Sequence, residues 1–217
     1  MTVTDSEPTG TVATAAPAHH HGKHWIDDWR PEDPQFWATV GRPVARRNLI
    51  FSIFAEHIGF SVWLLWSIVV VQMTAAADGT PAASGWALTT TQALWLVAVP
   101  SGVGALLRLP YTFAVPVFGG RNWTVISALL LLIPCLGLAW AVSDPGIPFG
   151  LLLLVAATAG FGGGNFASSM ANISFFYPEK EKGWALGLNA AGGNIGVAAA
   201  QKVVPLVVVA GGGVALS

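Results

Sequence analysis

Five long apolar segments restrict this chain to folds that are stable in a lipid bilayer. They run at about residues 48–73, 92–117, 123–142, 149–176 and 184–210. Each reaches the roughly 20 residues that an α-helix needs to cross the hydrocarbon core. Because lipid offers the backbone no hydrogen-bonding partner, we expect these segments to be helices and not strands. The predicted fold class is therefore an all-α polytopic membrane protein.

The composition agrees with this fold class and separates a tail from the apolar region. Only 10% of the residues are charged, whereas soluble domains carry about 25%. Residues 1–45 are instead rich in Thr, Ala, Pro, His and acidic residues. We predict a partly disordered cytosolic tail over 1–45 and a transmembrane bundle over 46–217.

Basic residues mark every second connection and predict the orientation in the membrane. They fall in three groups: Arg42, Arg46 and Arg47 before the first span, Arg121 after the second, and Lys180 and Lys182 after the fourth. The connections after the first and third spans hold no Lys or Arg. Since basic loops stay inside, we place the N-terminus and residues 118–122 and 177–183 in the cytosol, and 74–90 and 143–148 outside.

The number of spans predicts that the chain is part of a longer protein. Many transporter folds repeat blocks of three helices, and five spans leave the second block incomplete. We therefore expect that the sequence is truncated before a C-terminal half.

Arg108 is the most informative of the four ionisable residues within the spans, because a charge at mid-bilayer is costly and usually functional. It shares a helical face with Ser101, Gly104, Tyr111 and Thr112. We expect this polar face to line a cavity in which Arg108 binds an anion. The alternative is an arginine that bonds carbonyls or a carboxylate to hold helices together.

Glu56, His57 and Lys202 are the other ionisable residues in the spans. Glu56 is a candidate proton carrier or, alternatively, an ion-pair partner that fixes the bundle. His57 is a candidate proton relay or a packed, hydrogen-bonded residue. Lys202 is expected to extend its ammonium toward the membrane surface.

Small and amide side chains recur at helical spacing in the fourth and fifth spans. The fourth span carries Gly164, Asn165, Ser168, Ser169 and Asn172, and the fifth carries Gly192, Gly193, Asn194 and Gly196. Glycines spaced by four residues let helices approach closely, so we assign most of these positions to helix packing. For Asn194, substrate contact and interhelical hydrogen bonding remain equally open.

Several motifs resemble nitrate/nitrite porters of the NarK type in the major facilitator superfamily. They are Arg46-Arg47-Asn48-Leu49, Gly104 to Tyr111, Phe118 to Thr124, Asn165 to Phe176, and the run from Gly187 to Gly196. The resemblance covers about residues 46–206, and the string from Asn165 to Phe176 is its most specific part. It implies that this chain is the N-terminal half of such a transporter.

The resemblance also implies a substrate site. In that family an arginine of the second helix binds the anion, which matches Arg108, and a phenylalanine of the fourth helix stacks on it, which matches Phe166. Phe60 and Asn194 match further residues that line the site. The family's second arginine and second aromatic residue come from the C-terminal half. The substrates implied are the small inorganic anions nitrate and nitrite.

The resulting hypothesis is secondary transport of nitrate and nitrite across the bacterial plasma membrane, by exchange through alternating access. The alternatives are proton-coupled nitrate uptake, with Glu56 or His57 titrating, and an anion channel for another anion. An enzyme is not expected, because no metal cluster or nucleophile–base pair is evident. We expect no cofactor, no metal site at His19, His20, His21 and His24, and no nucleic-acid partner.

The topology generates the first testable prediction. A cysteine introduced by Lys180→Cys should resist a membrane-impermeant maleimide added to intact cells, because the positive connection faces the cytosol. A cysteine introduced by Asp78→Cys should react under the same conditions. Labelling of position 180 from outside would contradict the predicted orientation.

Overall fold

The computed structural model describes residues 26–215 except 27, 77 and 83. Residues 1–25 of the predicted tail, with its four histidines, lie outside the described residues. Within the described part, five helical stretches are long and apolar enough to cross a membrane, which confirms the all-α fold class. They are Pro34–Gln72, Thr90–Phe118, Gly120–Val142, Phe149–Phe176 and Glu179–Gly211.

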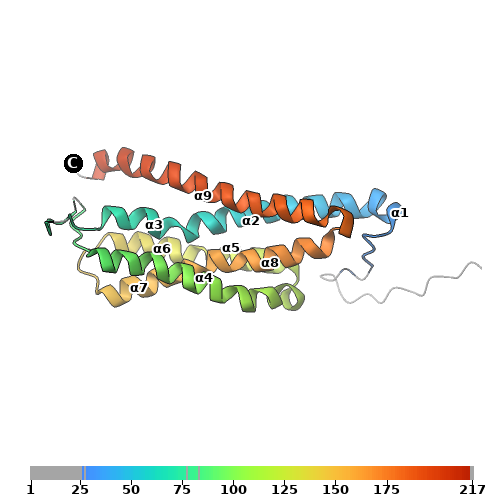
Figure 1. The fold of residues 1–217 in the computed structure, drawn as a ribbon, viewed down its shortest axis with the longest axis horizontal. Helices are drawn as coiled ribbons and strands as arrows, with labels where there is room; N and C mark the ends of the chain where they lie inside the picture. Colours follow the sequence, from blue (N-terminus) through green and yellow to red (C-terminus); the bar gives the residue numbers. More distant parts are fainter. Residues whose placement is uncertain (1–25, 27, 77, 83, 216–217) are drawn as a thin grey trace, which may run out of the picture.

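The helices lie side by side along the long axis of the molecule (Figure 1). The elements are α1 (Pro34–Phe36), the π-helical turn η1 (Trp37–Gly41), α2 (Arg42–Trp63), α3 (Leu65–Val69), the 3-10 turn η2 (Val70–Gln72), α4 (Thr90–Phe118), α5 (Gly120–Leu130), α6 (Leu132–Val142), α7 (Phe149–Thr158), α8 (Gly160–Phe176) and α9 (Glu179–Ala215). The helix α8 packs against both α2 and α4, and α9 packs against α2. The two helices that carry the glycine and asparagine motifs therefore both contact the first span.

Local sequence explains where several helices begin and end. Thr89 and Gln92 form a capping box at the start of α4, in which each side chain bonds the other residue's backbone N–H. Gly119 ends α4 with a φ of +79°, a conformation that glycine adopts without strain. The third span is interrupted at Leu131, three residues before Pro134, which has no N–H to donate to the preceding turn.

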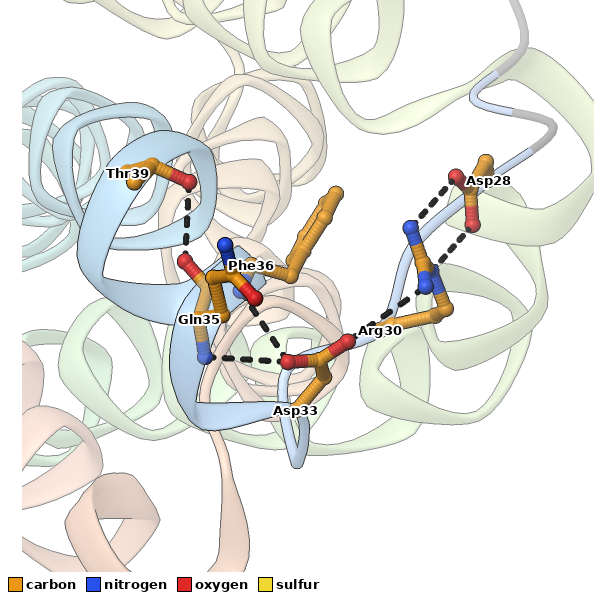
Figure 2. A network of polar contacts seen from close by, with 6 residues as sticks. All are labelled: Asp28, Arg30, Asp33, Gln35, Phe36 and Thr39. Atoms are coloured by element: carbon orange, nitrogen blue, oxygen red, sulfur yellow. Dashed lines mark hydrogen bonds and ion pairs between the residues drawn. The ribbon is translucent and has the colours of Figure 1, made fainter. Parts of the chain in front are cut away.

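Asp33 starts the first helix, earlier than the predicted start near residue 48. Its Oδ1 accepts the backbone N–H groups of Gln35 at 2.9 Å and Phe36 at 3.1 Å (Figure 2). Arg30 bonds Asp33 at 3.3 Å and Asp28 at 2.9 Å, which orders the chain ahead of the helix. These contacts fix the N-terminus of α1 as a side-chain cap does in soluble helices.

The start of the first span is joined to the first turn of α9. Glu181 accepts the indole N–H of Trp37 and a guanidinium N–H of Arg42, both at 3.1 Å. The Glu32 carboxylate accepts the backbone N–H of Glu179 at 2.8 Å. Part of the predicted tail is thus packed and helical, and its contacts come from residues more than a hundred positions away.

Apolar clusters occupy the two ends of the bundle and leave a more polar middle. At the α1 end, Trp37, Leu49, Ile173 and Tyr177 belong to one buried cluster. At the opposite end a larger cluster contains Trp66, Met73, Trp86, Leu88, Leu96 and Leu152. Candidate functional side chains are therefore the polar ones buried between these two ends.

Glycines bring the helix backbones together in that middle section. A Cβ on Gly162 would collide with the carbonyl oxygen of Gly59 on α2. A Cβ on Gly160 would lie 2.8 Å from the backbone nitrogen of Gly104 on α4. Gly196 of α9 lies against the backbone of His57 in the same way. This packing agrees with the prediction that small residues bring these helices close together.

The second prediction tests this backbone contact. Gly162→Ala should lower the thermal stability of the purified protein, because the added methyl group forces α8 away from α2. Overpacking of this kind costs about 1–3 kcal/mol.

Gly102→Ala is the matched control, since a Cβ there has no neighbour within 4 Å. It should leave stability unchanged or raise it by about 0.5–1 kcal/mol through helix propensity. Thermal unfolding of both variants in one detergent checks the pair. Equal stability of the two variants would contradict the close contact.

Candidate functional site

Arg108 lies on α4 in the middle of the bundle and is only partly buried. Its Nε donates a long hydrogen bond of 3.5 Å to the carbonyl oxygen of Gly163 on α8. Among the described residues, no carboxylate lies within ion-pair distance of its guanidinium. Of the structural alternative, the described residues therefore lack the carboxylate pairing but contain the bond to a carbonyl of another helix. Most of the guanidinium's hydrogen-bonding capacity remains available for another acceptor.

Two aromatic rings lie close to this guanidinium. Its central carbon lies 5.2 Å from the ring centroid of Phe166 and 6.0 Å from that of Trp63. Phe60 packs at 5.8 Å from Phe166 and at 5.5 Å from Trp63, measured between ring centroids. Rings at these distances stabilise the cation by cation–π attraction and give the site flat walls.

The structure thus brings together three residues that the resemblance assigned to one site: Arg108, Phe166 and Phe60. It adds Trp63, whose indole N–H donates to the carbonyl oxygen of Pro100 at 3.0 Å. Trp63 also covers Gly163, where a Cβ would lie 2.7 Å from the indole ring. The sequence signal for Trp63 is its position one turn after Phe60 on the same helical face.

The predicted polar face of α4 is divided in the structure. Gly104 and Tyr111 are buried, and Tyr111 approaches Gly164 of α8. Ser101 and Thr112 are exposed, and each hydroxyl donates to a carbonyl one turn back in its own helix. The expectation that all these residues line one cavity with Arg108 stays a prediction.

Asn194 does not reach across to another helix in this structure. Its side chain is exposed and donates to the carbonyl oxygen of Ala190 in its own helix at 3.0 Å. The preceding residue, Gly193, contacts the ring of Phe60, so this part of α9 lies beside the aromatic cluster. Interhelical hydrogen bonding was one of the two roles left open for Asn194, and no such bond is formed by it among the described residues.

The asparagine and serine motif of α8 is buried and hydrogen-bonded. Ser168 donates to the backbone oxygen of Asn165 at 2.8 Å. Asn172 donates to the side chain of Asn48 on α2 at 3.3 Å. The first contact lies within α8, and the second joins α8 to α2. The motif is therefore structural at these positions.

Ser169 lies at the centre of a second buried network. Its hydroxyl is 2.6 Å from that of Ser52 on α2 and accepts the amide N–H of Asn189 on α9 at 2.7 Å. The network therefore joins α2, α8 and α9 through side chains that are shielded from solvent. Asn189 and Ser52 were not predicted as site residues, because an isolated polar residue in a span carries no pattern.

Glu56 lies next to this network, one helical turn after Ser52, and is 0% exposed. Neither carboxyl oxygen has a hydrogen-bond partner among the described residues. No ion pair within the described part of the chain involves Glu56, so the ion-pair alternative is not realised there. His57 is half-buried, and its backbone contacts Gly196 of α9. Within the described ranges, no three His, Cys, Asp or Glu residues are placed to hold a metal ion.

Comparison with known proteins identifies the family. The sequence profile of the Major Facilitator Superfamily matches residues 48–214. The chain belongs to the Major Facilitator Superfamily. It is a multi-pass membrane protein, and this membership together with the transporter names of its relatives points to a transport protein and not an enzyme.

Three nitrate/nitrite transporters are similar to this chain over most of its length. The nitrate/nitrite transporter NarU of Salmonella typhimurium is 47% identical over 189 residues, which are 87% of this chain and 39% of that protein. NarU of Escherichia coli K12 is 47% identical over 188 residues, with the same coverage. The probable nitrate/nitrite antiporter NarK2 of Thermus thermophilus is 41% identical over 184 residues, 85% of this chain and 39% of that protein. The chain thus spans about two fifths of the length of these relatives.

Proposed function

We propose that this chain is the N-terminal half of a transporter that moves nitrate and nitrite across the bacterial plasma membrane. The observation that carries the proposal is the Arg108 guanidinium, which has no carboxylate partner and lies beside the rings of Phe166 and Trp63. The similarity to the NarU proteins supports the same substrates.

The chemistry of the two anions suits this arrangement. Nitrate and nitrite are small, planar and ionised at cellular pH, so their site must supply a positive charge. A guanidinium presents a planar fork of N–H donors that bonds two oxygens at once, whereas an ammonium is a point charge. Flat aromatic rings beside the guanidinium suit the face of a planar ion.

The proposal includes the parts that complete the transporter. The length of the relatives supports a further set of helices, which would supply a second arginine and a second aromatic residue to the site. We place the N-terminus, and with it the α1 end of the bundle, in the cytosol on the strength of the Lys and Arg pattern. The halves would rock about the anion to give alternating access.

Replacement of Arg108 tests the proposed site. Arg108→Lys in the complete transporter should preserve membrane insertion but weaken nitrate binding, because the charge remains while the fork is lost. The loss of charge-assisted hydrogen bonds should cost about 1.5–3 kcal/mol. This corresponds to about tenfold or more in affinity.

Nitrate titration of the purified wild type and variant measures the effect, with thermal unfolding recorded in parallel. Unchanged affinity together with lowered stability would show that Arg108 is structural and that the anion binds elsewhere.

Exchange of the two anions is the proposed mode of transport, and it generates the next prediction. Phospholipid vesicles that contain the complete transporter and are loaded with nitrite should take up nitrate without any pH gradient. Vesicles without internal anion should take up much less under the same conditions, because the return step of an exchanger needs cargo. Equal uptake with and without internal nitrite would favour a channel.

Proton-coupled nitrate uptake is the second candidate function. One observation favours it: Glu56 is fully buried, and neither of its carboxyl oxygens has a hydrogen-bond partner among the described residues.

A further inference from the structure

Trp63 on α2 contacts both of the other helices that form the anion site. It is half-buried, and its indole N–H donates to the carbonyl oxygen of Pro100 on α4 at 3.0 Å. The indole covers Gly104 on α4, where a Cβ would lie 3.0 Å from its nitrogen. It also covers Gly163 on α8, where a Cβ would lie 2.7 Å from the ring. One side chain thus touches the helix that carries Arg108 and the helix that accepts its hydrogen bond.

Gly163 is important to this site because its carbonyl oxygen accepts the Nε–H of Arg108. It lies in the run Gly162-Gly163-Gly164, which has no side chains to hold its backbone in place. Neighbouring residues must therefore position this backbone, and at Gly163 the neighbour is the indole of Trp63. Whatever fixes the Gly163 carbonyl also fixes the direction in which the guanidinium points.

The bond to Gly163 uses one edge of the guanidinium and leaves another free. A guanidinium carries one N–H on Nε and four on its two Nη atoms. The Nε–H of Arg108 points at Gly163, and neither Nη atom has a partner among the described residues. The two Nη atoms present a pair of parallel donors, a geometry that matches two oxygens of a planar oxyanion. The free edge is therefore the one suited to nitrate or nitrite.

We propose that Trp63 is a positioning residue of the anion site, which turns the Nη edge of Arg108 toward the bound anion. It acts through the carbonyl of Gly163 and through its own ring, 6.0 Å from the guanidinium carbon. This role needs no contact with the anion and differs from the stacking role that the resemblance assigns to Phe166. The inference rests on the proposed function, because it requires Arg108 to bind the anion.

The hydrogen bond to Pro100 is what holds the indole over Gly163. An indole turns about two side-chain bonds, and a fixed acceptor for its N–H selects one orientation. A shorter aromatic side chain at position 63 would keep a ring beside Phe60 but lose the bond to α4. It would also leave part of Gly163 uncovered, because a phenyl ring is smaller than an indole.

The orientation of the guanidinium affects affinity because a bidentate contact needs both donors in the plane of the anion. A side chain that is free to rotate loses that freedom on binding, which costs free energy. A guanidinium that Trp63 has already oriented avoids this cost. An ammonium has no plane to orient, so Trp63 should contribute little to binding in Arg108→Lys.

A double-mutant cycle on nitrate binding tests this role in the complete transporter, including any segment that follows Ser217. With Arg108 present, Trp63→Phe should raise the Kd for nitrate about three- to tenfold, the range for one lost hydrogen bond. In Arg108→Lys the same substitution should change the Kd by less than about twofold. The difference between the two backgrounds measures the coupling between the indole and the planar fork.

Gly163→Ala gives an independent measurement in which Trp63 itself is retained, and it completes the cycle if Trp63→Phe does not fold. The added methyl group displaces the indole, since it would lie 2.7 Å from the ring. It should weaken nitrate binding when Arg108 is present and have little effect in Arg108→Lys.

Trp86→Phe is the matched control. Trp86 is buried in the apolar cluster at one end of the bundle, and its indole N–H donates to the carbonyl oxygen of Val142 at 3.2 Å. The substitution removes the same kind of hydrogen bond from the same kind of side chain. It should lower thermal stability and leave the Kd for nitrate unchanged.

The outcomes separate this inference from the proposed function. An equal rise in Kd with Arg108 present and in Arg108→Lys would overturn the positioning role and leave the anion site intact. An unchanged Kd in Trp63→Phe, or an equal rise in Trp86→Phe, would also overturn it. Failure of the wild type to bind nitrate, or unchanged affinity in Arg108→Lys, would instead overturn the proposed function, and the inference with it.

Discussion

The contact of the α8 backbone with α2 and α4 is the constraint on which the rest of the structure depends. Gly162 faces the carbonyl of Gly59, and Gly160 faces the backbone of Gly104 and the side chain of Val103. In lipid, association of helices relies on close van der Waals packing, because the surrounding solvent is itself apolar. This packing sets the distance between α4 and α8, and that distance brings the guanidinium of Arg108 to the carbonyl of Gly163.

The same contact explains why charge is tolerated in the middle of the bundle. Apolar clusters close the two ends, while the glycine-rich section between them leaves polar backbone and hydroxyl groups accessible to side chains. Arg108 lies against aromatic rings on one side of this section, and Glu56 lies beside serine and asparagine on another. The two groups carry opposite charges when ionised, and no ion pair joins them in the described part of the chain.

The sequence predicts the five helices well, because length and hydropathy decide them without tertiary information. It predicts the early start of the first helix poorly, since Trp37 and Arg42 are held by Glu181, far along the chain. It could not predict that Ser101 and Thr112 bond carbonyls of their own helix, because an exposed polar residue in a span is equally compatible with a contact to another helix. The sequence pattern does not single out Trp63 and Asn189 as site residues, because their roles depend on contacts with residues of other spans.

The position of Trp63 makes its indole fluorescence a built-in probe of the anion site. Its indole is fixed by a hydrogen bond to Pro100 and lies 6.0 Å from the guanidinium carbon of Arg108. The emission of an indole depends on the electric field across its ring, and a change of net charge at Arg108 alters that field directly. Fluorescence from this single position therefore follows occupancy of the guanidinium without a chemical label, once the other tryptophans are replaced.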